Sequence, residues 1–83
     1  MLRKYLRSGT VKENLLFLNM KVRDVIKLIE ADGWYLARTR GSHRHFKHPT
    51  KQGIVTVAGK MSIDVPIGTL KSIWRQAQLE DDG

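Results

Sequence analysis

The sequence predicts a small α+β domain in which two amphipathic helices cover one face of a three-stranded antiparallel sheet. Two apolar stripes at helical spacing lie towards the two ends of the chain, and three short β-rich segments lie between them. Glycine- and proline-containing turns separate these segments, as in a meander. The expected order is therefore helix, strand, strand, strand, helix, and the second face of the sheet should stay open to solvent.

The first predicted helix covers residues 22–32. Its apolar stripe follows the i, i+3, i+4, i+7 spacing and consists of Val22, Val25, Ile26 and Ile29. Asp24 lies in the first turn, where the helix dipole favours an acid. Gly33 follows the helix, and because glycine adopts the left-handed conformation easily, we expect it to cap the C-terminus.

The three predicted strands cover residues 34–38, 43–48 and 54–58. Residues 40–42 should form the first turn, because Gly41 can adopt a positive φ. Residues 49–53 should form the second connection, because a proline cannot donate to a strand ladder. The aromatic residues expected in the core are Trp34, Phe46 and Trp74, and Tyr35 is the aromatic residue expected to be exposed.

The second predicted helix covers residues 67–78, with Pro66 at its start. Its stripe has the same spacing and consists of Leu70, Ile73, Trp74 and Ala77. The sequence therefore divides into an N-terminal extension (residues 1–19), a domain (residues 20–80) and an acidic tail (residues 81–83). An equally acceptable interpretation is that Met20 is the natural start of the protein.

Composition narrows the class of protein. A chain of 83 residues forms one domain with a modest core and is too short for a large cofactor domain, so no cofactor is expected. A net charge of +7 favours polyanionic partners, nucleic acid above all. The absence of cysteine excludes disulfides and thiolate metal sites and fits a cytoplasmic protein. The longest apolar run, residues 15–18, is far short of the ~20 residues of a membrane span.

Positive charge is concentrated in the middle of the chain, because residues 33–63 contain no acid. This segment contains all three histidines, and its lysines and arginines are Arg38, Arg40, Arg44, Lys47, Lys51 and Lys60. A run of like charges is usually only a solvated surface. A segment of this length without a single acid nevertheless favours contact with nucleic-acid phosphates.

Alternation along the second strand divides its side chains between the two faces of the sheet. Phe46 is the best core residue, so Phe46, Arg44 and His48 should face the helices. A shift of the register by one residue would invert this assignment. The side chains expected on the open face are His43, His45 and Lys47.

An exposed histidine among cations can cleave RNA without a metal. The 2′-hydroxyl must lose a proton and the leaving 5′-oxygen must gain one, and an imidazole exchanges protons near neutral pH. Nearby cations would stabilise the charge on the phosphoryl oxygens. The pattern alone also allows His43 to be an ordinary surface residue. No metal site is expected, because His48 points away from the other two histidines and no carboxylate lies near them.

Several short motifs follow one another in the chain. They are Gly33-Trp34, Arg38, Gly41-Ser42-His43, Phe46, His48-Pro49, the strand 54–57 and the segment 68–73. No single motif is specific, but together, in a chain this short and basic, they resemble the HicA family of toxins, also called the YcfA-like family. The resemblance covers residues 20–79. Residues 58–64 lack the proline and histidine that many relatives have there.

The resemblance implies a fold like that of a double-stranded RNA-binding domain. It also implies a metal-independent endoribonuclease toxin of a type II toxin–antitoxin pair that cuts mRNA, and a HicB-type antitoxin that blocks its active site. By its Gly-Ser-His motif, the resemblance implies that His43 is the catalytic general acid or base and that the turn at Gly41 presents it. The candidate RNA contacts are Arg38, Arg40, Ser42, Arg44, His45, Lys47 and Lys60.

Two other functions stay open. A non-catalytic RNA-binding domain, or an inactive toxin remnant, would bind RNA in a salt-dependent way and leave it intact. A protein whose basic face only docks an acidic partner would bind that partner tightly and RNA weakly.

Overall fold

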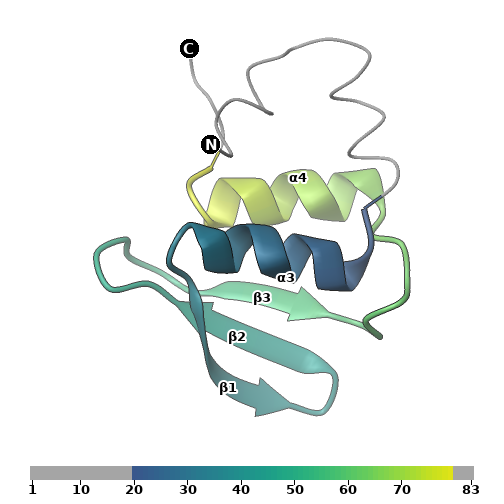
Figure 1. Ribbon diagram of the computed structural model, residues 1–83, viewed down its shortest axis with the longest axis horizontal. Helices are drawn as coiled ribbons and strands as arrows, with labels where there is room; N and C mark the ends of the chain where they lie inside the picture. The colour runs from purple at the N-terminus through teal and green to yellow at the C-terminus, as the bar shows by residue number, and fades with distance from the viewer. Residues whose placement is uncertain (1–19, 80–83) are drawn as a thin grey trace, which may run out of the picture.

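The computed structural model describes residues 20–79 and has the predicted α-β-β-β-α architecture (Figure 1). Its helices and strands are α3 (Val22–Ala31), β1 (Tyr35–Arg40), β2 (His43–Lys47), β3 (Val55–Ala58) and α4 (Ile67–Gln76). The strands form one antiparallel sheet in the order β1-β2-β3. The α+β class and the three-stranded open sheet with two helices are confirmed.

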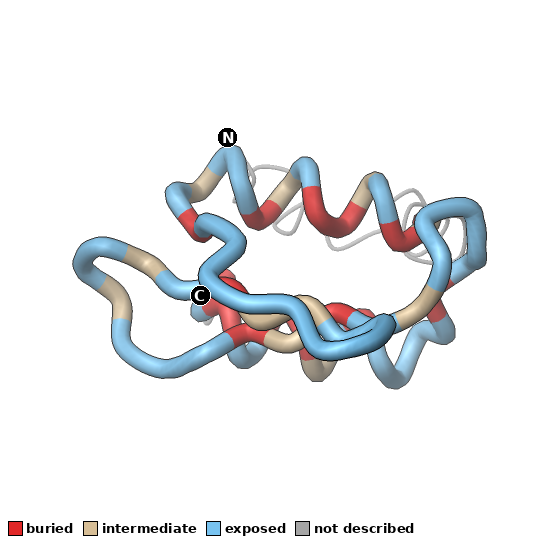
Figure 2. The backbone as a smooth tube through the Cα atoms, turned by 90° about the horizontal axis from the view of Figure 1, so that it is seen from below, coloured by how far each residue is buried: buried red, intermediate tan, exposed pale blue. Residues whose placement is uncertain are grey.

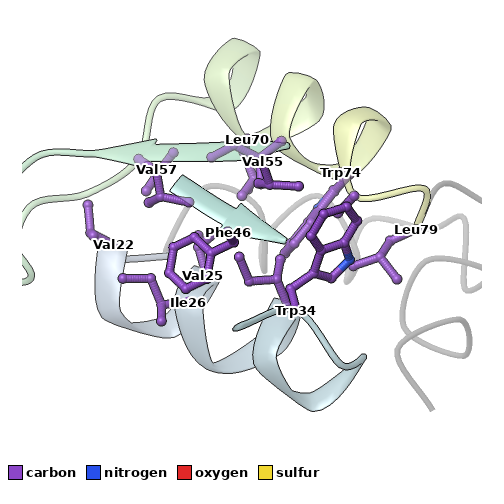
Figure 3. Packing of buried hydrophobic residues seen from close by; sticks show 14 of the residues in the cluster. Val22, Val25, Ile26, Trp34, Phe46, Val55, Val57, Leu70, Trp74 and Leu79 are labelled. Atoms are coloured by element: carbon purple, nitrogen blue, oxygen red, sulfur yellow. The ribbon is translucent and has the colours of Figure 1, made fainter. Parts of the chain in front are cut away.

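Both helices contribute to a single core with one face of the sheet (Figure 3). The predicted stripes of α3 and α4 are buried, and so are the three aromatic residues expected inside. Buried positions recur every three or four residues along each helix, as an amphipathic stripe requires, with exposed positions between them (Figure 2). The core residues are Met20, Val22, Val25, Ile26, Ile29, Trp34, Phe46, Val55, Val57, Val65, Leu70, Ile73, Trp74, Ala77 and Leu79.

Helix α3 ends in the cap that Gly33 predicts. Gly33 has a φ of 110°, and its backbone N–H donates to the carbonyl of Glu30, while the N–H of Trp34 donates to the carbonyl of Ile29. These two bonds define a Schellman motif. Because the amide of Trp34 completes the cap, β1 begins at Tyr35 and not at residue 34 as predicted.

Helix α4 ends earlier than the predicted residue 78, and for the same reason. Gln78 has a φ of 57°, its N–H donates to the carbonyl of Arg75, and the N–H of Leu79 donates to the carbonyl of Trp74. This is again the Schellman pattern, here with a glutamine in the left-handed position. The side chain of Gln78 donates to the carbonyl of Gln52, which ties this cap to the β2–β3 loop.

The connector between β3 and α4 caps the other end of α3. The N–H groups of Val22 and Arg23 donate to the carbonyls of Ile63 and Met61. The N–H of Lys21 donates to the carboxylate of Asp24, which places this acid as predicted in the first turn. The first turn of the helix thus has protein partners for amides that no helix can satisfy internally.

His48 fastens the β2–β3 loop to the end of α3. Its Nε2 lies 2.7 Å from the carbonyl oxygen of Asp32, and its Nδ1 lies 3.1 Å from the backbone N of both Thr50 and Lys51. Because the two amides can only donate, Nδ1 accepts and the proton sits on Nε2. The predicted strands 43–48 and 54–58 each stop one residue short at this loop, where His48 binds the loop backbone.

The predicted N-terminal extension, residues 1–19, and the predicted acidic tail, residues 81–83, lie outside the described residues. Among residues 20–79, neither helix is long and apolar enough to cross a membrane.

Replacing Gly33 with alanine should destabilise the fold more than the same change at Gly53. Both glycines have a φ near 100° (110° and 92°), so each alanine is strained by about 1–3 kcal/mol. A Cβ at Gly33 would also lie 2.7 Å from Nε2 of His48, whereas a Cβ at Gly53 has open space around it. Urea unfolding should show the difference, and equal loss in both variants would contradict this contact.

Replacing His48 with alanine should lower the free energy of unfolding by about 2–4 kcal/mol, because it leaves the half-buried carbonyl of Asp32 and the half-buried N–H of Lys51 without their partner and removes a packed ring. Replacing the exposed His43 should change it by less than about 0.5 kcal/mol. Tryptophan fluorescence during urea unfolding reports both, since the ring of Trp34 packs edge-on against His48 at 5.2 Å. Similar stability of the two variants would show that the His48 contacts contribute little.

Candidate active site on the open face of the sheet

The pairing of the strands determines which side chains share a face. Phe46 is 1% exposed and lies opposite Leu36 and Val55, so these positions belong to the helix side. The alternate positions of β2 lie on the other side, which we call the open face. The residues of the open face are Tyr35, Arg38, Arg40, His43, His45, Lys47, Thr56 and Ala58.

A β-bulge at Ala37 brings two arginines onto the open face. Leu36 lies opposite Phe46, but the residue opposite the next position of β2 is Arg38, with Ala37 as the extra residue. Strict alternation from Leu36 would have put Arg38 and Arg40 on the helix side. The bulge shifts the alternation by one residue, and both arginines therefore join the histidines.

A tight turn holds His43 at one end of the open face. Gly41 and Ser42 connect the paired residues Arg40 and His43, and Gly41 has a φ of 57°. A positive φ at the first central residue alone is typical of a type II′ turn, whose twist suits a two-residue hairpin. The N–H of Gly59 donates to the carbonyl of Ser42 over 3.3 Å, which ties this turn to the end of β3.

The three histidines have different surroundings. The side chain of His43 is exposed and forms no hydrogen bond or ion pair with any other described residue. His45 is half-buried, and its Nδ1 shares a hydrogen bond with the hydroxyl of Thr56 at 2.9 Å. His48 lies on the helix side with both ring nitrogens bonded to backbone. Of these rings, His43 is the one with both nitrogens available to a ligand.

The candidate cations divide into two groups. Arg38, Arg40 and Lys47 are exposed on the open face, and the exposed Lys60 follows Gly59, close to the Gly41-Ser42 turn. Arg44 does not join them. It lies opposite the buried Val57, and its Nη1 donates to the carbonyl of Gly59 at 2.9 Å.

Lys51 also belongs to the segment without acids, residues 33–63, but it forms contacts within the fold. Its Nζ lies 2.6 Å from the Asp32 carboxylate and also donates to the carbonyls of Ala77 and Gln78. It therefore joins the ends of α3 and α4, away from the open face. No acid lies on the three strands, and within residues 20–79 no three metal-ligating side chains come together.

Neither the place of Thr56 beside His45 nor the bulge in β1 was predicted from the sequence. The side of the sheet on which Thr56 lies could have been predicted, because it alternates with two buried valines on β3. The bulge has no such signal, since Ala37 is an unremarkable strand residue flanked by residues that tolerate either face. Only the observed pairing reveals the side to which Arg38 belongs.

Comparison with known protein families agrees with this fold. A sequence model described as the HicA toxin of bacterial toxin–antitoxin systems matches residues 22–79, from the first residue of α3 to the cap of α4. A comparison with curated proteins returned no match. The matched segment includes the whole sheet, the Gly41-Ser42 turn and His43. The chain therefore belongs to the HicA toxin family of bacterial toxin–antitoxin systems.

Proposed function

We propose that this toxin is a metal-independent endoribonuclease that cleaves mRNA on the open face of the sheet, with His43 as general acid or base. The surroundings of His43 are the observation that carries the proposal. Its ring is exposed and unpaired within the described structure, and it shares a face with Arg38 and Arg40. A proton-transfer group beside cations is what cleavage of a phosphodiester by its own 2′-hydroxyl requires.

The remaining open-face residues have complementary roles in this proposal. Arg38, Arg40 and Lys47 contact phosphates, and Ser42 and Lys60 extend the contacts around the turn. The guanidinium groups offer paired donors to phosphate oxygens and stabilise the charge that develops there. His43 carries out one of the two proton transfers in this scheme, and His45 or a water molecule carries out the other.

Two candidate RNA contacts act differently from the exposed arginines. His45 is oriented by Thr56, so its free nitrogen points to a fixed position for a phosphate or a proton. Arg44 binds the carbonyl of Gly59, whose own N–H binds Ser42. We therefore assign Arg44 a positioning role, in which it holds the turn that presents His43.

Replacing His43 with alanine should lower RNA cleavage by about 10²–10⁴-fold, the usual contribution of a general acid or base. The measurement incubates a long mRNA with the purified protein in EDTA and resolves the products on a denaturing gel. Lys71→Ala, which removes an exposed cation from α4, is the control and should cleave like the parent.

Two outcomes would overturn the assignment. Undiminished cleavage by the His43→Ala protein would exclude His43 as the catalytic group. Intact RNA with the parent protein, together with a mobility shift on a native gel, would instead support a non-catalytic RNA-binding domain or an inactive toxin remnant.

A HicB-type antitoxin is the second partner that we propose. Membership of the family implies a cognate antitoxin. The open face is its natural target here, because it is positively charged and has no acid on any strand. An acidic antitoxin surface placed on this face would pair with Arg38 and Arg40 and would deny RNA access to His43.

Replacing Arg38 and Arg40 with glutamine should weaken RNA binding and reduce its dependence on salt. Each lost phosphate contact lowers the slope of log K against log salt by about 0.7 for a single strand. Binding is measured in the His43→Ala background, so that the RNA stays intact. The matched control replaces Lys71 and Arg75, two exposed cations of α4, with glutamine and should leave the slope unchanged.

The same variants test the antitoxin. The Arg38→Gln and Arg40→Gln changes should weaken binding of the cognate HicB-type protein, and the α4 changes should not. A stable complex that holds toxin, antitoxin and RNA at once would contradict a shared surface.

A further inference from the structure

We propose that Tyr35 is a stacking platform for one unpaired base of the RNA, so that the substrate must be single-stranded where it crosses the far end of the open face. This inference rests on the proposed ribonuclease function and adds a recognition residue to it. Tyr35 lies at the opposite end of the open face from His43, directly across from Lys47.

Exposure distinguishes Tyr35 from the other aromatic residues that the structure describes. Tyr35 is 51% exposed, whereas Trp34, Phe46 and Trp74 are buried in the core. Tyrosine is common in strands because it packs well on a pleated surface, but neither helix of residues 20–79 packs over Tyr35. The ring therefore presents an aromatic surface to solvent on the same face as the candidate catalytic histidine.

The neighbours of Tyr35 make this surface suitable for a nucleic acid. Lys47 lies across from it on β2, and Arg38 is the next open-face residue of β1 beyond the bulge. Single-strand binding proteins combine these two elements, with cations that follow the backbone and aromatic rings on which bases stack. A site built only to dock an acidic protein surface would need the cations without the ring.

The length of β2 separates the base that would stack on Tyr35 from the bond that His43 would cleave. The open-face residues His43 and Lys47 are the two ends of the five-residue β2, which spans about 13 Å at ~3.3 Å per residue. A base stacked on Tyr35 therefore belongs to a nucleotide displaced from the bond that His43 would cleave. In an A-form duplex the bases are paired and stacked on one another and cannot lie flat on a side chain. The platform thus selects single-stranded RNA.

Leu36 provides a matched control. It is the next residue of β1, it is 50% exposed, and it lies on the opposite side of the sheet, across from Phe46. Its replacement removes a similar exposed apolar surface from the same edge strand without touching the open face.

The test measures binding of a short fluorescein-labelled single-stranded RNA to the His43→Ala protein by anisotropy. Adding Tyr35→Ala should weaken binding about tenfold. Adding Tyr35→Phe should keep it, because the ring remains, and Leu36→Ala should leave it unchanged. The same RNA annealed to its complement should bind with an affinity that Tyr35→Ala does not alter.

A second measurement uses a series of oligonucleotides, each of which lacks the base of one nucleotide, and distinguishes stacking from a purely structural role of Tyr35. Removing the base at one position should weaken binding to the His43→Ala protein. The same removal should not weaken binding to the protein that also has Tyr35→Ala, since the stacking partner is already missing. Equal single-strand binding with and without the Tyr35 ring would overturn this inference and leave the ribonuclease proposal intact. Failure of the His43→Ala protein to bind RNA at low salt would overturn both.

Discussion

Burial of Phe46 fixes the arrangement on which the rest of this structure depends. Side chains of a strand alternate with a period of two, so one fully buried residue of β2 determines the face of every neighbour. With Phe46 in the core, His43, His45 and Lys47 must face solvent. A shift of one residue would expose an aromatic ring, and it would bury two histidines and a lysine at a high cost in desolvation.

The two ends of the domain are held by different chemistry. At one end, the loop after β2 is fastened by polar contacts: His48 binds the backbone at the end of α3, and Lys51 joins Asp32 to the two carbonyls that follow α4. At the other end, Gly41, Ser42 and Gly59 form tight backbone turns that hold His43 beside the cations. His48 and Lys51, which hold the fold together, thus lie at the opposite end of the domain from His43.

The sequence predicts the features that follow from a repeated apolar spacing, but not those that depend on how the strands pair or on contacts between distant residues. Apolar spacing identifies both helices, and Phe46 identifies the open face, because these signals repeat or are chemically unambiguous. Alternation with Phe46 places Arg44 on the helix side, but nothing in the sequence predicts its bond to the carbonyl of Gly59 or the side to which Arg38 belongs. The left-handed conformation of Gln78 was also not predicted, because it depends on the loop and cap contacts around it. The same conformation of Gly33 was predicted, because glycine favours it at the end of a helix.

The bulge in β1 has a consequence for the toxin when it is alone. β1 is an edge strand, exposed along its whole length, and such an edge can template pairing with a second chain. The extra residue at Ala37 interrupts the even spacing that a new strand would need, and two arginines project beside it. Both are devices by which natural sheets resist edge-to-edge aggregation. The feature that gathers positive charge on the open face thereby also makes this edge of the sheet a poor template for a second chain.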